Sequence, residues 1–283
     1  MVISFMAMNI SPNKEHATTT LMLDREGGRI AYDVQGAGPL VICAPGMGDI
    51  RQTFRYLVPA LVDAGYRVAT FDLRGHGESA TTFASYDDEA EASDILALAG
   101  HLGSPATVIG NSMGSAAGVI ANAQRPELVT ALVLVGPFVR NPHLNGFMKG
   151  IMRVATAAPW AAPVWKAYLR GLYAGRKPAD QAEFAAAANT AMRRAGYAAT
   201  FSKTARLSHD PAEAVLSRVT APTLIVMGEL DPDFPKPADE ANWIAQQLSA
   251  QVLMVPESGH YPQSQRPDIV NPAVVAFLKA NVA

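Results

Sequence analysis

The sequence predicts an α/β protein with a mostly parallel, eight-stranded sheet and helices on both of its faces. Short β-rich runs alternate with longer helical stretches along most of the chain. Repeated strand–helix–strand units form parallel sheets with the helices outside. The run PLVICA at 39–44 is almost continuously apolar, as expected for a strand that is buried on both faces. Two runs that are separated only by Glu26 and Gly27 predict a hairpin, which adds an antiparallel edge.

The same patterns place each element in order. We expect strands at 21–25, 28–34, 39–44, 67–71, 106–110, 130–135, 222–228 and 250–255. Helices are expected at about 53–64, 87–102, 112–124, 238–248 and 268–280, and Gly65 ends the first of them.

The interval from about Arg140 to Pro211 breaks this alternation. It contains no convincing strand, and its prolines divide it into several short helices. We therefore expect a helical cap at 140–211, inserted into an α/β core formed by 1–139 and 212–283. Apolar side chains of such a cap belong either to its core or to the wall of a substrate pocket. The candidates are Phe147, Met148, Met152, Trp160, Trp165, Tyr168 and Tyr173.

Composition and charge exclude several classes of protein. Apolar residues make up 49% and charged residues 17% of the 283 residues, which indicates a globular protein rather than a disordered one. The net charge is −2 without a basic block, so no nucleic-acid partner is expected. No apolar run approaches the roughly 20 residues that cross a bilayer, so no membrane partner is expected either.

The cellular location is predicted from two features of the chain. Its first residues lack the positive segment, long apolar core and cleavage site of a secretory signal. Cys43 is the only cysteine, so an internal disulfide is impossible and a reducing compartment is favoured. We expect a cytoplasmic protein in which Cys43 is a buried packing residue.

The central motif for chemistry is Gly110-Asn111-Ser112-Met113-Gly114, which follows a predicted strand and opens a predicted helix. A nucleophilic serine in this context must sit on a sharp, strained turn, and flanking glycines allow the backbone to approach closely. Taken alone, the motif also fits a glycine-rich turn with an idle serine. Two further signals favour the nucleophile.

The first of these signals is the segment 44–49, Ala-Pro-Gly-Met-Gly-Asp, which follows the strand at 39–44. A tetrahedral intermediate needs two fixed N–H donors for its oxyanion. The residue after the nucleophile supplies one donor and this loop supplies the other. We therefore predict the backbone N–H groups of Met47 and Met113 as oxyanion donors, with Gly46 next to the substrate.

The second signal is the order of an acid and a histidine along the chain. Asp231 follows one predicted strand and His260 follows the next, so both reach the same sheet edge as Ser112. A neutral serine hydroxyl is a poor nucleophile; His260 would take its proton, and Asp231 would hold the imidazole in the required tautomer. Asp233 is the alternative acid, followed by Glu229 and Glu257.

The remaining histidines have no motif around them. His76 is expected as a structural turn residue, and His16, His101, His143 and His209 as solvated or packing residues. No pair has the spacing of metal ligands. We therefore predict no metal and no cofactor.

These motifs resemble those of the α/β-hydrolase family from about residue 28 to the end. The segment 71–79, FDLRGHGES, is similar to that family's turn after the fourth strand. Gly228, Asp231 and Pro235 resemble its acid motif, and Ser258-Gly259-His260 resembles its histidine motif. The resemblance implies the family's fold and a catalytic triad of Ser112, Asp231 and His260.

Two departures from the family bear on the substrate. Many relatives have histidine where this chain has Pro45, and histidine is also common where it has Asn111. Neither change removes the backbone N–H groups that would bind the oxyanion, so hydrolytic activity is still expected. A serine nucleophile also separates the chain from epoxide hydrolase and haloalkane dehalogenase relatives, which have aspartate at the elbow.

We predict a serine esterase or lactonase that acts on a small-molecule ester or lactone. In overall character the chain is similar to serine-dependent macrolide esterases of the antibiotic-resistance type, which open a large lactone ring. One alternative is a carbon–carbon bond hydrolase of aromatic ring cleavage, whose acidic substrate could pair with a cap arginine. Those arginines are Arg153, Arg170, Arg176, Arg193, Arg194 and Arg206. Another alternative is a ligand receptor that keeps the triad and turns over slowly.

Overall fold

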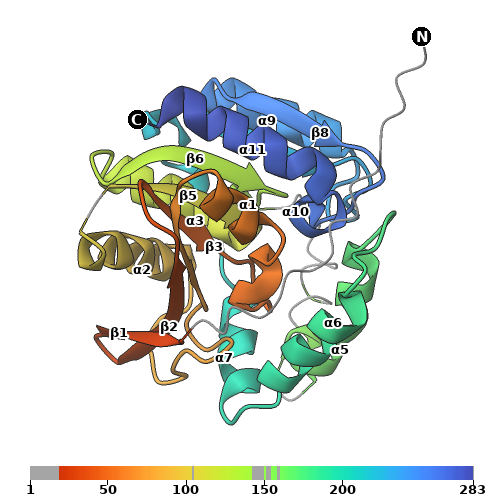
Figure 1. The fold of residues 1–283 in the computed structure, drawn as a ribbon. Helices are drawn as coiled ribbons and strands as arrows, with labels where there is room; N and C mark the ends of the chain where they lie inside the picture. The colour runs from red at the N-terminus through yellow and green to blue at the C-terminus, as the bar shows by residue number, and fades with distance from the viewer. Residues whose placement is uncertain (1–18, 104, 142–149, 151–153, 158–159, 283) are drawn as a thin grey trace.

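The computed structural model describes residues 19–103, 105–141, 150, 154–157 and 160–282. Eight strands form one sheet in the order β1-β2-β4-β3-β5-β6-β7-β8 (Figure 1). All neighbouring pairs from β4 to β8 are parallel, whereas β1 and β2 add an antiparallel edge. The predicted α/β-hydrolase fold, with a mostly parallel sheet and an antiparallel hairpin, is thus confirmed. The strands are β1 (Leu21–Arg25), β2 (Gly28–Gln35), β3 (Leu40–Ala44), β4 (Arg67–Phe71), β5 (Ala106–Asn111), β6 (Val129–Val135), β7 (Thr223–Gly228) and β8 (Gln251–Val255).

Helices cover both faces of the sheet because successive side chains of a buried strand point to opposite sides. One apolar cluster joins Val41 and Cys43 of β3 to α1 and α11. A second cluster joins Leu40 and Ile42 to the helices of the other face. Cys43 is fully buried, and burial raises the pKa of its thiol. The covering helices are α1 (Leu57–Asp63), α2 (Asp88–His101), α3 (Met113–Gln124), α9 (Pro237–Leu248) and α11 (Pro267–Asn281).

The first predicted helix differs from the structure. The sequence pattern suggested one helix over about 53–64, but the chain forms a 3₁₀ turn, η1 (Arg51–Phe54), and then α1. Pro59 lies in the first turn of α1, where its missing N–H leaves no helical hydrogen bond unmade. The shorter helix therefore accommodates a proline that a helix beginning at 53 would have held in its interior.

Several helices lie between β6 and β7 in the chain, where the sequence predicted a cap. They are α5 (Ala161–Leu172), α6 (Gln181–Ala191), α7 (Tyr197–Thr204) and α8 (Asp210–Glu213), followed by η2 (Leu216–Arg218). In Figure 1, α5, α6 and α7 lie together beside the sheet. Arg55 of the core forms an ion pair with Asp180 of this segment at 2.6 Å. The division into a core and a cap at 140 and 211 stays a prediction.

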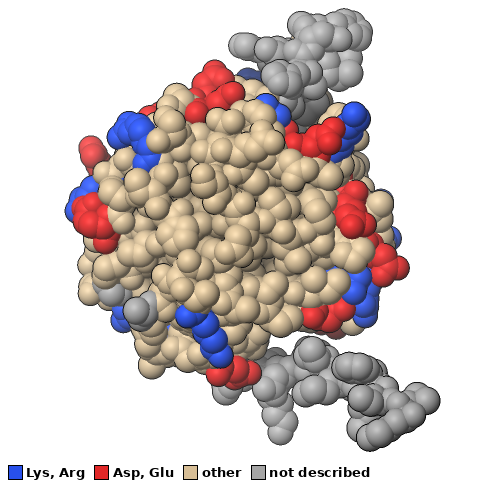
Figure 2. Space-filling model, turned by 90° about the horizontal axis from the view of Figure 1, so that it is seen from above, with Lys and Arg blue, Asp and Glu red and all other residues tan. Residues whose placement is uncertain are grey.

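Charged side chains lie around the rim of one face of the molecule (Figure 2). Figure 2 shows one face on which acidic and basic side chains are mixed around the rim and uncharged side chains fill the centre. Within the described ranges, no helix is both long enough and apolar enough to span a membrane.

Candidate active site

Ser112 occupies the sharp turn between β5 and α3. Its φ of 55° and ψ of −118° are uncommon for a residue with a side chain and mark local strain. The flanking glycines permit the turn: a Cβ on Gly110 would lie 2.2 Å from the carbonyl oxygen of Gly114. A Cβ on Gly114 would lie 2.2 Å from the carbonyl oxygen of Ala44. The geometry is that of a nucleophile elbow, with the serine side chain partly exposed.

Hydrogen bonds fix the backbone around this serine. The Ser112 N–H donates to the carbonyl oxygen of Val135 at 2.9 Å. The neighbouring Asn111 is fully buried, and its Nδ2 donates to the carbonyl oxygens of Val135 and His260 at 3.0 and 3.3 Å. Asn111 thereby ties the end of β5 to the loop that carries the histidine. The sequence marked Asn111 only as a departure from the family.

The loop after β3 lies directly against Ser112. A Cβ built on Gly46 would be 2.8 Å from the serine Cβ and 3.4 Å from its Oγ. The side chain of Met47 packs beside Tyr197 and Phe201 of α7. Gly46 therefore borders the space around the serine hydroxyl, and Met47, the oxyanion donor that the sequence predicts, is the next residue in this loop.

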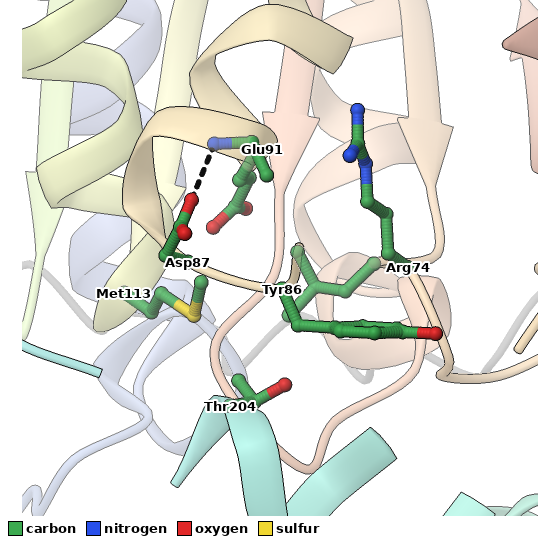
Figure 3. Close-up of a pocket in the computed structure, with 8 residues that line it drawn as sticks. Arg74, Tyr86, Asp87, Glu91, Met113 and Thr204 are labelled. Atoms are coloured by element: carbon green, nitrogen blue, oxygen red, sulfur yellow. Dashed lines mark hydrogen bonds between the residues drawn. The ribbon is translucent and has the colours of Figure 1, made fainter. Parts of the chain in front are cut away.

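Met113, the other predicted donor, is the first residue of α3, and the unpaired N–H groups of a helix start favour negative charge. Its side chain lines a cavity of about 10 Å³ together with Glu91 and Thr204 (Figure 3). That volume suits about one water molecule. Any contact of Met113 with a reacting oxygen must therefore use its backbone.

His260 and two carboxylates meet at the ends of β7 and β8. The imidazole Nδ1 lies 2.8 Å from Asp231 Oδ2 and 3.4 Å from Asp233 Oδ2. Asp231 is 2% exposed, and its other oxygen accepts the backbone N–H of Asp233 at 3.0 Å. Tyr168 of α5 donates its hydroxyl to Asp233 Oδ1. Asp231, the predicted acid of the triad, and Asp233, its first alternative, thus face the same ring nitrogen, and Asp231 is the nearer of the two.

These charges control the protonation of the histidine. Burial lowers the pKa of His260, but the carboxylates of Asp231 and Asp233 outweigh it and raise the pKa to about 9. Burial raises the pKa of Asp233, and the charge of His260 lowers it in turn. The arrangement therefore stabilises an imidazolium, the species that forms when a histidine accepts a proton.

The backbone of Gly136 lies against the imidazole ring of His260. Its φ is 50°, and a Cβ there would lie 3.1 Å from His260 Nδ1 and 3.2 Å from Cε1. Phe138 contacts both Ser112 and His260. Its N–H donates to the carbonyl oxygen of Ser112 at 3.4 Å, and its ring centroid lies 5.9 Å from that of His260. Neither Gly136 nor Phe138 was predicted from the sequence. A glycine directly after a buried strand was the available signal for Gly136.

The predicted pocket residues from the inserted helices have different positions. Phe147 and Met148, like Met152, lie outside the described residues. Trp160 is 50% exposed and donates its Nε1–H to the carbonyl oxygen of Val154 at 2.8 Å. Trp165 lies over the loop after β3: a Cβ on Gly48 would be 1.9 Å from its Nε1. Of these two tryptophans, the structure brings Trp165 to the site.

The other histidines make contacts away from the elbow. His76 is fully buried in the turn after β4, with Nδ1 2.9 Å from the carbonyl oxygen of Arg74. Burial lowers its pKa to about 4, so its ring stays neutral. His209 pairs with Asp88 at 2.7 Å, and His101 lies 3.0 Å from the hydroxyl of Tyr32. His16 and His143 lie outside the described residues.

Three potential metal ligands also occur together here. One ligand atom each from Asp231, Asp233 and His260 lies within 4.8 Å of the other two. Zinc would require each ligand atom at about 2.0–2.2 Å. Nδ1 already lies at hydrogen-bonding distance from Asp231, which is the geometry of a carboxylate that orients a base.

The elbow, the adjoining loop and the carboxylate–histidine pair all follow the carboxyl ends of parallel strands, and together they define a hydrolase of the α/β type. The chain matches the model of the Alpha/beta hydrolase family over residues 41–273 and belongs to that family. It is 28% identical to a 2-(acetamidomethylene)succinate hydrolase of Mesorhizobium japonicum, covering 89% of this chain and 93% of that protein. It is 26% identical to a probable esterase of Oryza sativa subsp. japonica, covering 88% and 94%.

The solved structure of a thermophilic esterase from Thermogutta terrifontis is similar in fold. The TM-score is 0.77, with 20% sequence identity, 94% of this chain and 100% of that chain covered.

Proposed function

We propose that the chain is a serine hydrolase that cleaves a carboxylic ester or lactone through an acyl-enzyme. Ser112 is the nucleophile, His260 the general base and Asp231 the acid that orients it. The observations that carry this proposal are a strained Ser112 after one parallel strand and, after another, a histidine whose Nδ1 is held by Asp231. Because Nδ1 is occupied, Nε2 is the ring nitrogen that remains for the serine proton.

In the proposed mechanism, Ser112 Oγ attacks the carbonyl carbon while His260 takes its proton. The N–H groups of Met47 and Met113 bind the oxyanion that forms. Collapse of the tetrahedral intermediate breaks the bond to the leaving oxygen, which receives the proton from the imidazolium. Water then attacks the acyl-enzyme by the same route and releases the acid. The partner required is a small-molecule ester or lactone alone, without a cofactor.

The preferred substrate hypothesis is a bulky lactone. The likeness to serine-dependent macrolide esterases is one of overall character, and the aromatic side chains of α5 and α7 beside the site would suit a large apolar ring. A carbon–carbon bond hydrolase of ring-cleavage products is the second candidate. The acidic substrate of such an enzyme would need a free cation near Ser112. Arg55 is a cation whose charge acts on Asp49, in the loop beside Ser112. Arg55 is already paired with Asp180.

The experiment that tests the proposed function is substitution of the nucleophile. Ser112→Ala should lower kcat on a simple aryl ester by about 10⁶ and abolish labelling by a fluorophosphonate probe. Gly100→Ala is a matched control, because a Cβ there meets nothing within 4 Å. A mutant that keeps more than about one per cent of the wild-type rate would exclude Ser112 as the nucleophile.

Substrate class is tested separately by mass spectrometry. A panel of macrolides, simple esters and a ring-cleavage dienoate is incubated with the enzyme, and a product that has gained one water identifies substrate and bond. Rapid turnover of any ester distinguishes an enzyme from a slow receptor. Cleavage of the dienoate with every ester and macrolide intact would favour the carbon–carbon hydrolase.

A further inference from the structure

Several buried polar atoms without a hydrogen-bond partner gather around the loop at 47–49. Asp49, Tyr173 and Tyr197 are 3%, 5% and 2% exposed. Asp49 Oδ2, the Tyr197 hydroxyl and the indole N–H of Trp165 make no hydrogen bond of normal geometry to the described residues. The Tyr173 hydroxyl lies near the Ser264 hydroxyl, also without a hydrogen bond of normal geometry. Buried polar groups in folded proteins are almost always bonded to protein, water or ligand. We call Asp49, Trp165, Tyr173 and Tyr197 the Asp49 cluster.

The members of the Asp49 cluster come from separate elements but lie close together. Trp165 Nε1 lies against Gly48, the residue before Asp49. Trp165 packs against Tyr197 in one apolar cluster and against Tyr173 in another. The charge of Asp49 adds to the effect of burial in raising the pKa of both tyrosines. The carbonyl oxygen of Leu172, the residue before Tyr173, accepts the N–H of His260 at 2.8 Å, and the charge of Asp49 contributes to the raised pKa of His260. The cluster therefore adjoins both the oxyanion loop and the proposed base.

The carboxyl group of Asp49 is only half satisfied by the described part of the protein. Its Oδ1 accepts the N–H of Ile50 at 3.0 Å. Burial raises its pKa to about 6, although the Ile50 N–H, the Thr53 hydroxyl and the charge of Arg55 lower it. Near neutral pH this group is therefore mainly a carboxylate, and its Oδ2 lacks a well-placed donor among the described residues.

The combination of groups selects one ligand chemistry. A ligand carboxylate would be repelled by Asp49. An ammonium group would bond Asp49 but leave the donors of Trp165 and the tyrosines unused, and it would lie near the cation of Arg55. A neutral hydroxyl donates to Asp49 Oδ2 and accepts from a phenol or indole at the same time.

We infer that the Asp49 cluster is a subsite that binds a hydroxyl group of the substrate beside the scissile ester. This inference rests on the proposed function and names the substrate class more closely as a hydroxylated ester or lactone. The hydroxyl would fix the substrate by one bond to Asp49 and another from Tyr197 or Trp165. A substrate that lacks it would leave those groups unpaired, which is the basis of strong discrimination against a missing hydroxyl.

The test compares p-nitrophenyl esters of straight-chain acids whose far end is a methyl, hydroxyl, ammonium or carboxylate group. For the best chain length, wild type should prefer the hydroxyl ester over the methyl ester by at least about tenfold in kcat/KM. Tyr197→Phe removes one oxygen and should reduce that ratio to within about threefold of one. Tyr32→Phe is the matched control, because this buried tyrosine bonds His101 at another part of the fold.

Binding to the Ser112→Ala protein separates the two proposals. Calorimetry with the same esters reports the hydroxyl preference as a ratio of Kd values even if no ester is cleaved. Absence of turnover by the wild type, with the binding ratio retained in Ser112→Ala, would reject the proposed function alone. Equal binding of hydroxyl and methyl esters at every chain length would overturn the subsite, as would a preference for ammonium or an equal loss in Tyr32→Phe.

Discussion

Asp233 Oδ2 lies 3.4 Å from His260 Nδ1, the same ring nitrogen that Asp231 contacts at 2.8 Å. The longer distance is beyond a good N–H···O hydrogen bond, so Asp233 acts on the imidazole mainly through its charge. Tyr168 of the inserted helix α5 holds Asp233 by a hydrogen bond. One carboxylate thus orients the ring and the other adjusts its protonation.

The two acids should differ in their effect on activity. Asp231→Asn should lower kcat by roughly 10⁴, because an amide favours the wrong imidazole tautomer. Asp233→Asn should cost far less, because the hydrogen bond to Asp231 remains. Steady-state kinetics of both variants at one pH would show this, and the reverse ranking would make Asp233 the acid of the triad.

The rate should depend on pH through His260. Only neutral imidazole accepts the serine proton, and neighbouring carboxylates raise the pKa of His260 to about 9. We expect kcat/KM to rise with pH through neutrality with a midpoint above the ordinary value of about 6.5. Asp233→Asn should move that midpoint down. A profile that is flat between about pH 5 and 8 would contradict a histidine base.

The same shift predicts a stability effect. A histidine whose folded pKa is raised stabilises the fold fully below its unfolded pKa. That contribution is lost as the pH rises towards about 9. This loss of stability should occur over the same pH range as the rise in kcat/KM. Urea unfolding of the wild type and of Asp233→Asn at several pH values measures it.

The close approach of Gly46 to the nucleophile should make it intolerant of a side chain. A methyl group in Gly46→Ala would lie 2.8 Å from Ser112 Cβ and 3.4 Å from Oγ, so the serine must move. A misplacement on the order of 1 Å can cost about 10² in rate. We expect a loss of that order in kcat/KM with circular dichroism unchanged. Gly100→Ala should behave as wild type, and an active Gly46→Ala would place the reacting carbonyl elsewhere.

Glu91 should destabilise the fold at neutral and higher pH. It is 3% exposed, neither of its carboxylate oxygens has a partner within the described part of the chain, and it lines the small cavity behind Met113 (Figure 3). Burial, with the nearby charges of Asp88 and Asp94, raises its pKa well above the ordinary value. The folded protein therefore retains a proton that the unfolded chain releases, and stability falls as the pH rises above about 4.5.

Replacement of this carboxyl should remove that pH dependence. Glu91→Gln should raise the free energy of unfolding by at least about 1 kcal/mol near pH 8 and by nothing near pH 4. Urea denaturation at both pH values measures the difference. An equal effect at both would show that packing, and not the charge of Glu91, governs the site.

The sequence predicted the sheet well because its parallel strands are short apolar runs that end at glycines, prolines or acids. Ser112, Asp231 and His260 each follow a predicted parallel strand, and this placement predicted that they lie at one edge of the sheet. Contacts between elements that are distant in the chain could not be predicted from the sequence. Nothing in the sequence places Tyr197 of α7 against Met47 of the loop after β3, because the position of α7 depends on how the inserted helices pack.

The placement of these helices between β6 and β7 has a consequence for how the protein diversifies. The two strands are hydrogen-bonded neighbours, from Leu132 and Thr223 to Val135 and Val226, although about 90 residues of chain separate them. The entropy of closing such a loop grows only logarithmically with its length, so a doubling costs only about 0.6 kcal/mol. Insertions, deletions and recombination within this stretch are therefore almost neutral for the pairing of β6 with β7, and selection can remodel ligand preference there without rebuilding the sheet.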